Sequence, residues 1–443
     1  VRLSTTTTGI TVGGEVAATQ DYPLSRPTLD LNFAAQKKLD PRITYQRTGV
    51  ASFIDKFGLV KIVGDNVPRF DHESDTGECK GLLIEESRTN LQPHSEQHSP
   101  DAADGFINIE SNMTVDYDPG VVTPTGETTG AITFVESGGS GQHYLGLDHY
   151  GAVTSGQTYT FSFFIKNISG SDTDNVKVIT TTAAFPYVVR TFYFSGTNAG
   201  TTNNADSFMT KFPNGWWRCN IAVTTNNNFS QTAFSIDYRG YGSGSPYDNV
   251  VALWGIQTEL GAFPTSYIRT GNATSGGTQT RGTDVVEIIE EEFSEFYNQP
   301  EGTIVSEIMI PSAYPITGKA SVMAVFSDGS YNNRLNLASS TGSATFNADV
   351  NIGSNTPTRA TLGNYTSGSY SIKAAMAYKA SDTAGSLNGA AVGTSSPSGT
   401  LPLLTRADIG KDHQNNNPLN GHMRRLMYYS RRLSNNQLRT LTS

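Results

Sequence analysis

The residues of this chain best suited to chemistry are aromatic and polar side chains that could contact a sugar. Carbohydrate recognition uses aromatic faces that stack on C–H edges, with hydrogen bonds from amide, carboxylate or guanidinium groups. Because adjacent side chains on a strand point to opposite faces, one of Trp216 and Trp217 is expected in the core and the other at the surface. The candidate carbohydrate-binding residues are Trp217, Tyr241 and Tyr247 beside a Gly/Ser loop, and Asp408, His413 and Asn415 to Asn417 in a polar loop.

Catalysis of glycoside hydrolysis would need two carboxylates that face each other roughly 5 to 9 Å apart. Glu85 and Glu86 are adjacent, so on one strand their side chains point to opposite faces. Other acids stand alone in or beside expected strands, and their partners cannot be read from the sequence: Asp237, Glu259, Asp284 and Glu307. We therefore predict no catalytic residue and expect a protein that is not an enzyme.

Metal and cofactor sites receive little support from residue spacing. His94 and His98 have i, i+4 spacing, but Pro93 and Pro100 bracket them and favour a loop. No cofactor is expected. Calcium stays open, because loop acids can bind it and can equally cap their own turns. Those acids are Asp101, Asp104, Asp116 and Asp118.

Composition and charge exclude several classes of protein. The 443 residues include 44 glycines, only 16% are charged, and the net charge is −9. This composition favours many short strands joined by tight turns over a helical bundle. An acidic chain without a basic run is a poor partner for nucleic acid, and no apolar stretch is long enough to span a membrane as a helix. Cys79 and Cys219 are the two cysteines, and whether they pair is left open.

The elements that must position these residues are strands throughout. Thr158 to Lys166 alternates apolar and polar side chains, and Asn214-Gly215 is a type I′ hairpin signal. Ser434 to Gln437 has the form of a capping box, which predicts a C-terminal helix docked by leucines. The predicted fold class is all-β, with a small N-terminal β module followed by two antiparallel β-sandwich, or jelly-roll, domains.

Four segments are predicted along the chain. Residues 1–20 form an extended arm, and residues 21–92 form a small module with little core of its own, which serves attachment or packing between subunits. Residues 93–285 and 286–443 form the two sandwiches, joined through a Gly/Thr/Ser-rich stretch. A module of that size must bury its apolar face against a neighbouring domain or subunit.

Three stretches together resemble structural proteins of tailed bacteriophages. Val67 to Asp71, followed by Gly81 to Leu91, resembles a signature of tail-fibre or head-fibre proteins. Trp254 to Ile268 resembles the closing strand of a carbohydrate-binding-module-like sandwich in the same proteins. Ala377 to Lys379, Leu387 to Gly389 and Gly421 to Ser434 look like a concanavalin A-like, or laminin-G-like, lectin domain.

The residues that carry this resemblance have structural explanations. Arg88 can pair with Glu85, Glu86 or Asp71 and so lock the last turn of the module. Pro264 fixes its own φ, so the strand leaves the sandwich edge at a defined point. Trp254 stands in an apolar strand and is expected in the core.

The resemblance implies a non-enzymatic virion protein that lies at the exterior of the tail or capsid. Its expected partners are copies of itself, most simply in a homotrimer, other virion proteins, and glycan on the host-cell surface. Two alternatives stay open. One is a tailspike that depolymerises polysaccharide, and the other is an architectural tail or capsid decoration protein without a ligand.

Overall fold

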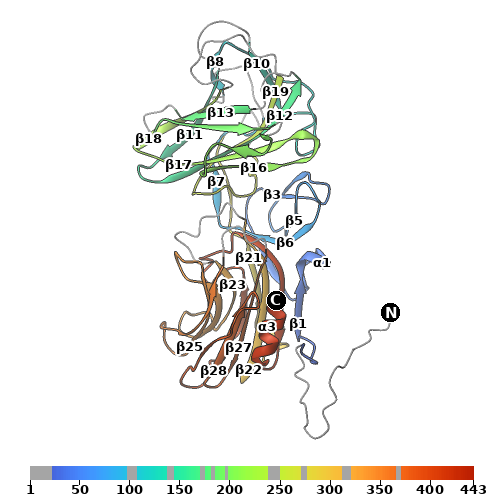
Figure 1. Ribbon diagram of the computed structural model, residues 1–443, viewed down its shortest axis with the longest axis vertical. Coiled ribbons are helices and arrows are strands. Elements are labelled where there is room, and N and C mark those ends of the chain that lie inside the picture. The colour runs from blue at the N-terminus through green and yellow to red at the C-terminus, as the bar shows by residue number, and fades with distance from the viewer. Residues whose placement is uncertain are drawn as a thin grey trace, which may run out of the picture.

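The protein is described here by a computed structural model that covers residues 22–96, 107–136, 144–169, 175–180, 185–194, 198–237, 250–270, 277–311, 321–365 and 371–443. The arm expected at residues 1–20 lies outside these residues, as do His98, Asp101, Asp104, Tyr241 and Tyr247. The all-β fold class is confirmed, with antiparallel sheets throughout. Figure 1 shows three tiers: one sandwich at the top, a small module in the middle and a second sandwich at the bottom.

The upper sandwich contains two six-stranded sheets. In spatial order one sheet comprises β16 (Ser207–Lys211), β17 (Trp217–Thr224), β12 (Thr158–Ser169), β19 (Val250–Leu260), β10 (Ile132–Glu136) and β9 (Met113–Asp116). The other comprises β15 (Thr201–Thr202), β14 (Val188–Tyr193), β13 (Asn175–Thr180), β18 (Phe229–Asp237), β11 (Tyr144–Val153) and β8 (Ile107–Ser111). Tyr159, Phe161 and Phe163 of β12 join the core between the sheets, as their alternation predicts.

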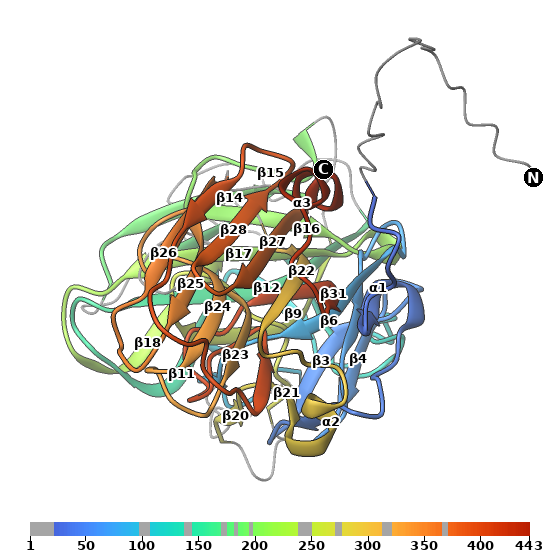
Figure 2. The same ribbon diagram turned by 90° about the horizontal axis from the view of Figure 1, so that it is seen from below.

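The lower sandwich also contains two sheets, which Figure 2 shows from below. One comprises β2 (Thr44–Gln46), β21 (Val285–Ile289), β30 (Arg406–Ile409), β23 (Val322–Ser327), β24 (Arg334–Ser339), β25 (Thr345–Asn351) and β26 (Thr358–Asn364). The other comprises β29 (Gly393–Ser395), β28 (Asp382–Leu387), β27 (Ile372–Lys379), β22 (Glu301–Met309), β31 (Gly421–Tyr429), β6 (Cys79–Ile84) and β5 (Phe70–His72), with β1 (Leu29–Asn32) also paired to β31.

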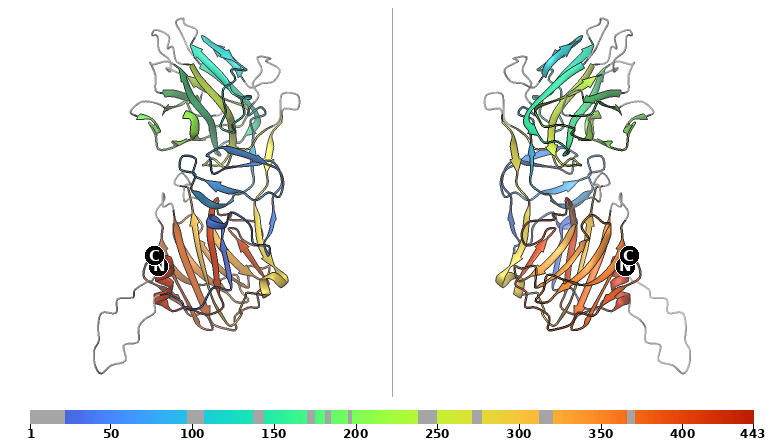
Figure 3. Two further views of the ribbon diagram at one scale, coloured as in Figure 1. Left: turned by 90° about the vertical axis from the view of Figure 1, so that its right-hand side faces the viewer. Right: turned by 90° about the vertical axis from the view of Figure 1, so that its left-hand side faces the viewer.

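The small module is therefore built into the lower sandwich. Gly421 to Met423 of β31 pairs with β6, and Arg425 to Tyr428 of the same strand pairs with β1. Leu29, Leu31, Leu82 and Ile84 are buried in the core of that sandwich. Two-stranded sheets complete the region, formed by β3 (Ala51–Ile54) with β4 (Val60–Val63) and by β7 (Arg88–Asn90) with β20 (Gln279–Arg281). Figure 3 shows the module between the two sandwiches from both sides.

Short-range signals in the sequence match the local structure. Asn214 and Gly215 both have positive φ, at 59° and 80°, and connect β16 to β17 as the hairpin signal predicts. Ser434 and Gln437 form the expected capping box of α3 (Asn435–Thr442), whose Leu438 is buried against the outer face of β27 and β28. Among the described residues, the other helical elements are α1 (Phe33–Gln36), α2 (Glu290–Ser294) and the 3₁₀ turn η3 (Pro213–Gly215).

Two further findings concern absences within the described part of the chain. No helix there has the length and apolar character needed to cross a membrane. Cys79 and Cys219 are both buried free thiols, in different sheets.

Candidate binding cleft

A buried ionic joint fixes the two sandwiches relative to each other. Arg69 donates from Nη1 to Glu85 Oε2 at 2.7 Å and from Nη2 to Asp284 Oδ2 at 2.6 Å. Glu85 in turn accepts hydrogen bonds from the backbone N–H and hydroxyl of Ser266, which follows β19 of the upper sandwich. Arg281 contacts Glu85 at 3.0 Å, and all of these charged side chains are almost fully buried. The joint thus ties the module to the ends of β19, β20 and β21.

The electrostatics of the joint keep the carboxylate of Glu85 ionised. Burial alone would raise the pKa of Glu85, but Arg281 and Arg69 lower it to about 2. Burial likewise opposes the charge on Arg69, and Asp284 and Glu85 raise its pKa despite that cost. Removing one partner from such a group would leave an uncompensated buried charge. The angle between the sandwiches is therefore held by charge pairs in addition to apolar contact.

Residues of the first two bacteriophage-like stretches meet at this joint. Of the three acids proposed as partners of Arg88, the structure selects Glu86, whose Oε1 lies 2.6 Å from Nη2. Glu85 and Asp71 bind other cations. Trp254 is fully buried, as expected, and packs against Phe164 with ring centroids 5.1 Å apart. Figure 1 places this region where the three tiers meet.

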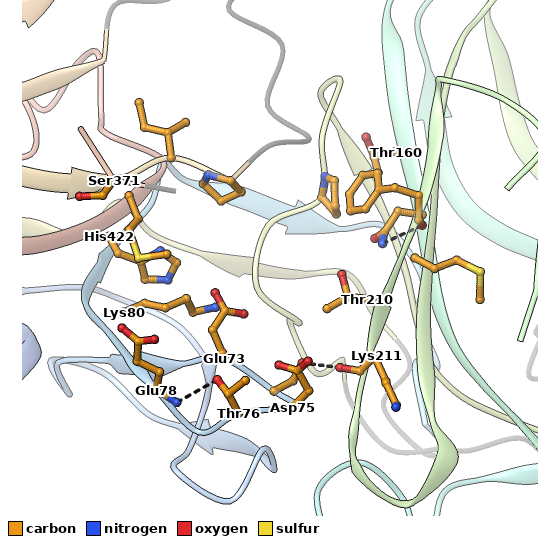
Figure 4. A pocket seen from close by; sticks show the side chains of 18 of the residues that line it. Glu73, Asp75, Thr76, Glu78, Lys80, Thr160, Thr210, Lys211, Ser371 and His422 are labelled. Atoms are coloured by element: carbon orange, nitrogen blue, oxygen red, sulfur yellow. Dashed lines mark hydrogen bonds between the residues drawn. The ribbon is translucent and has the colours of Figure 1, made fainter. Parts of the chain in front are cut away.

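An open cleft of about 1220 Å³ lies beside the joint and is lined by residues of both sandwiches and of the module. Its walls come from β16 and β17 of the upper sandwich, from the turn between β5 and β6, and from β22 and β31. The described side chains that line it include five acids, Glu73, Asp75, Glu78, Asp206 and Glu307, and three cations, Lys80, Lys211 and Arg424. Phe208, Thr210, Pro264 and Ser371 also line it. Figure 4 shows the cleft from close by and labels Glu73, Asp75, Glu78, Lys80 and Lys211 among the charged residues. The cleft exceeds the roughly 300–1,000 Å³ of a small-molecule pocket and so has room for an extended ligand.

The floor of the cleft is a buried histidine paired with a buried carboxylate. His422 Nε2 lies 2.8 Å from Asp71 Oδ2, and Lys80 Nζ lies 2.8 Å from the same oxygen. Burial opposes the charge on Asp71, but Lys80 and His422 lower its pKa and keep it ionised. Burial, together with the charge of Lys80, lowers the pKa of His422, which favours the neutral ring. A smaller cavity of about 170 Å³ shares His422 and Lys80 with the cleft and extends toward Tyr267.

The carbohydrate-binding residues predicted from sequence lie away from this cleft. Trp216 is fully buried, whereas Trp217 is half-buried and packs over Gly200, so one tryptophan is in the core as expected. None of the described candidates lines the cleft, and Trp217 lies in a different sandwich from the others. Tyr241 and Tyr247 lie outside the described residues.

The polar loop predicted as a second site is organised by its own acids. Asp408 is fully buried and bound by Arg406 and Lys411, at 2.7 and 2.8 Å. Asp412 accepts hydrogen bonds from the backbone N–H groups of Gln414 and Asn416, which shapes the loop. His413 packs against Tyr331 with ring centroids 4.3 Å apart, and Asn415 is exposed at the loop tip. The carboxylate of Asp408 is thus already paired with the side chains of Arg406 and Lys411. A sugar-binding role for His413 and Asn415 stays a prediction.

The cleft residues were not identifiable from the sequence as a site. Asp71 and His422 are 351 positions apart, and neither belongs to a recognisable catalytic or metal-binding spacing. The only signals were that Asp71 stands inside the first bacteriophage-like stretch and His422 inside the lectin-like stretch Gly421 to Ser434. No group of three or more potential metal ligands occurs among the residues that the structure describes, and the question of calcium stays open.

Comparison with known proteins identifies no family for this chain. No protein-family model matches it, and no curated protein sequence matches it. Similar solved structures include the CBM40 module of the Ruminococcus gnavus IT-sialidase bound to alpha2,3 sialyllactose, with 16% identity and a TM-score of 0.30 over 35% of this chain and 89% of that chain. Mouse laminin alpha1 domains LG4-5 share 11% identity with a TM-score of 0.23 over 65% of this chain and 88% of that chain. These are carbohydrate-binding-module and laminin-G structures, and at such scores they carry no argument about ligand or origin.

Proposed function

We propose that this chain is a non-enzymatic subunit of a tailed-bacteriophage fibre or spike that attaches to glycan on the host surface. The observation that carries this proposal is the open cleft of about 1220 Å³, lined by hydroxyl, carboxylate and cationic groups and by the ring of Phe208. Such walls can hydrogen-bond a chain of sugar hydroxyls and stack on their C–H faces. The bacteriophage-like stretches, the first two of which contribute Arg69, Glu85 and Ser266 to the joint beside the cleft, support the virion assignment.

In this proposal the protein stands at the virion exterior as a homotrimer. The N-terminal arm and the module contact sister chains or other virion proteins, and the sandwiches face the host. Three weak sites on one fibre raise the overall affinity, because the second and third contacts become intramolecular. Neither nucleic acid nor membrane insertion has a part in it.

Host attachment is tested with the purified, folded oligomer. Light scattering after size exclusion gives the number of chains, and a glycan array together with labelled protein on host cells gives binding. We expect a trimer that binds glycan at low affinity and cells at much higher affinity. A blank array and blank cells with correctly folded oligomer would favour the architectural alternative.

A polysaccharide depolymerase is the second candidate, because carboxylates stand on different walls of the cleft. Asp75 and Glu78 come from the turn between β5 and β6, and Asp206 precedes β16. Against it, Asp206 is paired with Arg190 and Glu78 lies 3.4 Å from Arg424, so two of these three acids have a cation beside them. New reducing ends after incubation with host polysaccharide would identify the depolymerase.

A further inference from the structure

The floor of the cleft holds a hydrogen-bond acceptor that no described residue uses. His422 is only 4% exposed, and its Nε2 faces the ionised carboxylate of Asp71 at 2.8 Å. A carboxylate accepts hydrogen bonds, so Nε2 carries the proton and Nδ1 of the neutral ring is an acceptor. Nδ1 is buried without a hydrogen-bond partner in the described part of the chain. Because most buried polar atoms are paired, this atom is a candidate acceptor for a ligand, as is Oδ1 of Asn220, whose residue also lines both cavities.

His422 presents its ring to the space between the tiers. It stands opposite Leu83 and Met309 in the sheet register, on the face turned away from the core that Met423 enters. Both the large cleft and the smaller cavity have His422 in their walls. Figure 4 shows the ring beside Lys80, with Glu73 directed toward the same space. A ligand in the cleft can therefore lie next to this ring.

The charge of the surrounding walls restricts the class of ligand. Five carboxylates and three permanent cations line the described part of the cleft, a balance of −2. Two of the cations already have carboxylate partners, since Lys80 binds Asp71 and Arg424 contacts Glu307 at 3.0 Å. Glu73 and Asp75 form no ion pair within the described residues. The cleft thus presents an excess of acceptors and negative charge, which favours a ligand rich in donors and disfavours an anion.

We propose that the cleft binds an uncharged, hydroxyl-rich saccharide, with Nδ1 of His422 accepting a hydrogen bond from one sugar hydroxyl and Glu73 accepting from others. Phe208 on the wall from β16 supplies an aromatic surface for the apolar face of the sugar. This inference rests on the proposed function, because it takes the ligand to be a glycan. It goes further because it excludes acidic polysaccharides as ligands and names His422 and Glu73 as residues that accept hydrogen bonds from the sugar.

The test measures binding of fluorescently labelled hexasaccharides to the full chain by anisotropy. The uncharged probes are hexamers of glucose, mannose, galactose and N-acetylglucosamine, and the charged probes are hexamers of galacturonate and of glucosamine. We expect at least one uncharged hexamer to bind, with the galacturonate hexamer at least roughly tenfold weaker. His422→Gln places an amide donor near the position of Nε2 and removes the acceptor at Nδ1, so affinity should fall roughly tenfold. The matched control, His94→Gln, changes a histidine that is also 4% exposed but lines neither cavity, and it should leave binding unchanged.

A second variant keeps the inference open to refutation if His422→Gln does not fold. Glu73→Gln with Asp75→Asn alters two side chains that are not fully buried and removes two negative charges from the cleft. Binding of the galacturonate hexamer should then approach that of the uncharged hexamer. If uncharged hexamers bind but neither variant changes the pattern, or if a charged hexamer binds best, the inference is wrong and the proposed function stands. If no hexamer of any class binds, both are wrong.

Discussion

Arg69 and Asp284 form a fully buried pair, with Nη2 and Oδ2 2.6 Å apart and 215 positions between them. The pair joins the module to the start of the lower sandwich, and Glu85 bridges both to Ser266 of the upper one. Because both charges are desolvated, each depends on its buried partners: Arg69 also pairs with Glu85 at 2.7 Å, and Asp284 also lies 3.6 Å from Arg47. This single contact therefore affects all three tiers.

Arg69→Met should lower the free energy of unfolding by about 3–5 kcal/mol, because Asp284 and Glu85 would be left as buried charges with too few partners. Arg42→Met is the matched control, since Arg42 also pairs with an aspartate, at 2.8 Å, but both side chains are partly exposed. That substitution should cost no more than about 1 kcal/mol. Denaturant titrations followed by tryptophan fluorescence give both values. Equal losses in the two variants would contradict the role assigned to the joint.

The joint should also make the protein sensitive to acid in a defined range of pH. The pKa of Glu85 is lowered from 4.5 to about 2, so its contribution is fully present above pH 4.5 and is lost as pH falls toward 2. The unfolded chain binds the proton first, and protonation therefore favours unfolding. The loss is on the order of 3 kcal/mol. Unfolding free energies between pH 6 and 3 should fall less steeply in Glu85→Gln than in the wild type, and parallel curves would count against this assignment.

Local features of the fold could be predicted from the sequence because their causes lie within a few residues. Asn214-Gly215 turns where both residues can adopt positive φ, and Ser434 caps a helix through a residue three positions away. The alternation in β12 placed Phe161 and Phe163 correctly in the core. Each of these signals depends on backbone geometry or on side-chain period, both of which are encoded locally.

The cleft could not be predicted, because its parts come from distant segments. Asp71, Lys80 and His422 meet only because β6 of the module pairs with β31 at the other end of the chain. Asp408 shows the opposite case. It was predicted to face a ligand, yet Arg406 and Lys411, two and three positions away, bind its carboxylate. A polar loop in a sequence does not reveal whether its charges are satisfied internally.

The two cysteines should behave as separate buried thiols. Burial raises the pKa of Cys219 well above its ordinary value and also raises that of Cys79, so little reactive thiolate forms at neutral pH. A thiol reagent such as dithionitrobenzoate should label neither cysteine rapidly in the native protein. In denaturant it should titrate two thiols without prior reduction. Fewer than two would indicate that the cysteines are oxidised or paired.

Gly261 should be intolerant of a side chain, because its backbone conformation is one that L-residues rarely adopt and because a Cβ there would meet the guanidinium of Arg88. Its φ is +140°, and a Cβ added there would lie 1.7 Å from Nη1 of Arg88. Gly261→Ala should therefore displace Arg88 from Glu86 and from the carbonyl of Leu260, at a cost of about 2–4 kcal/mol. Gly363→Ala is the control, because its φ is +128° and the added atom would come no closer than 3.9 Å to a neighbour, so it carries the backbone penalty alone, about 1–3 kcal/mol. Denaturant unfolding of both variants separates the clash from the backbone penalty, and equal costs would show that Arg88 can move aside freely.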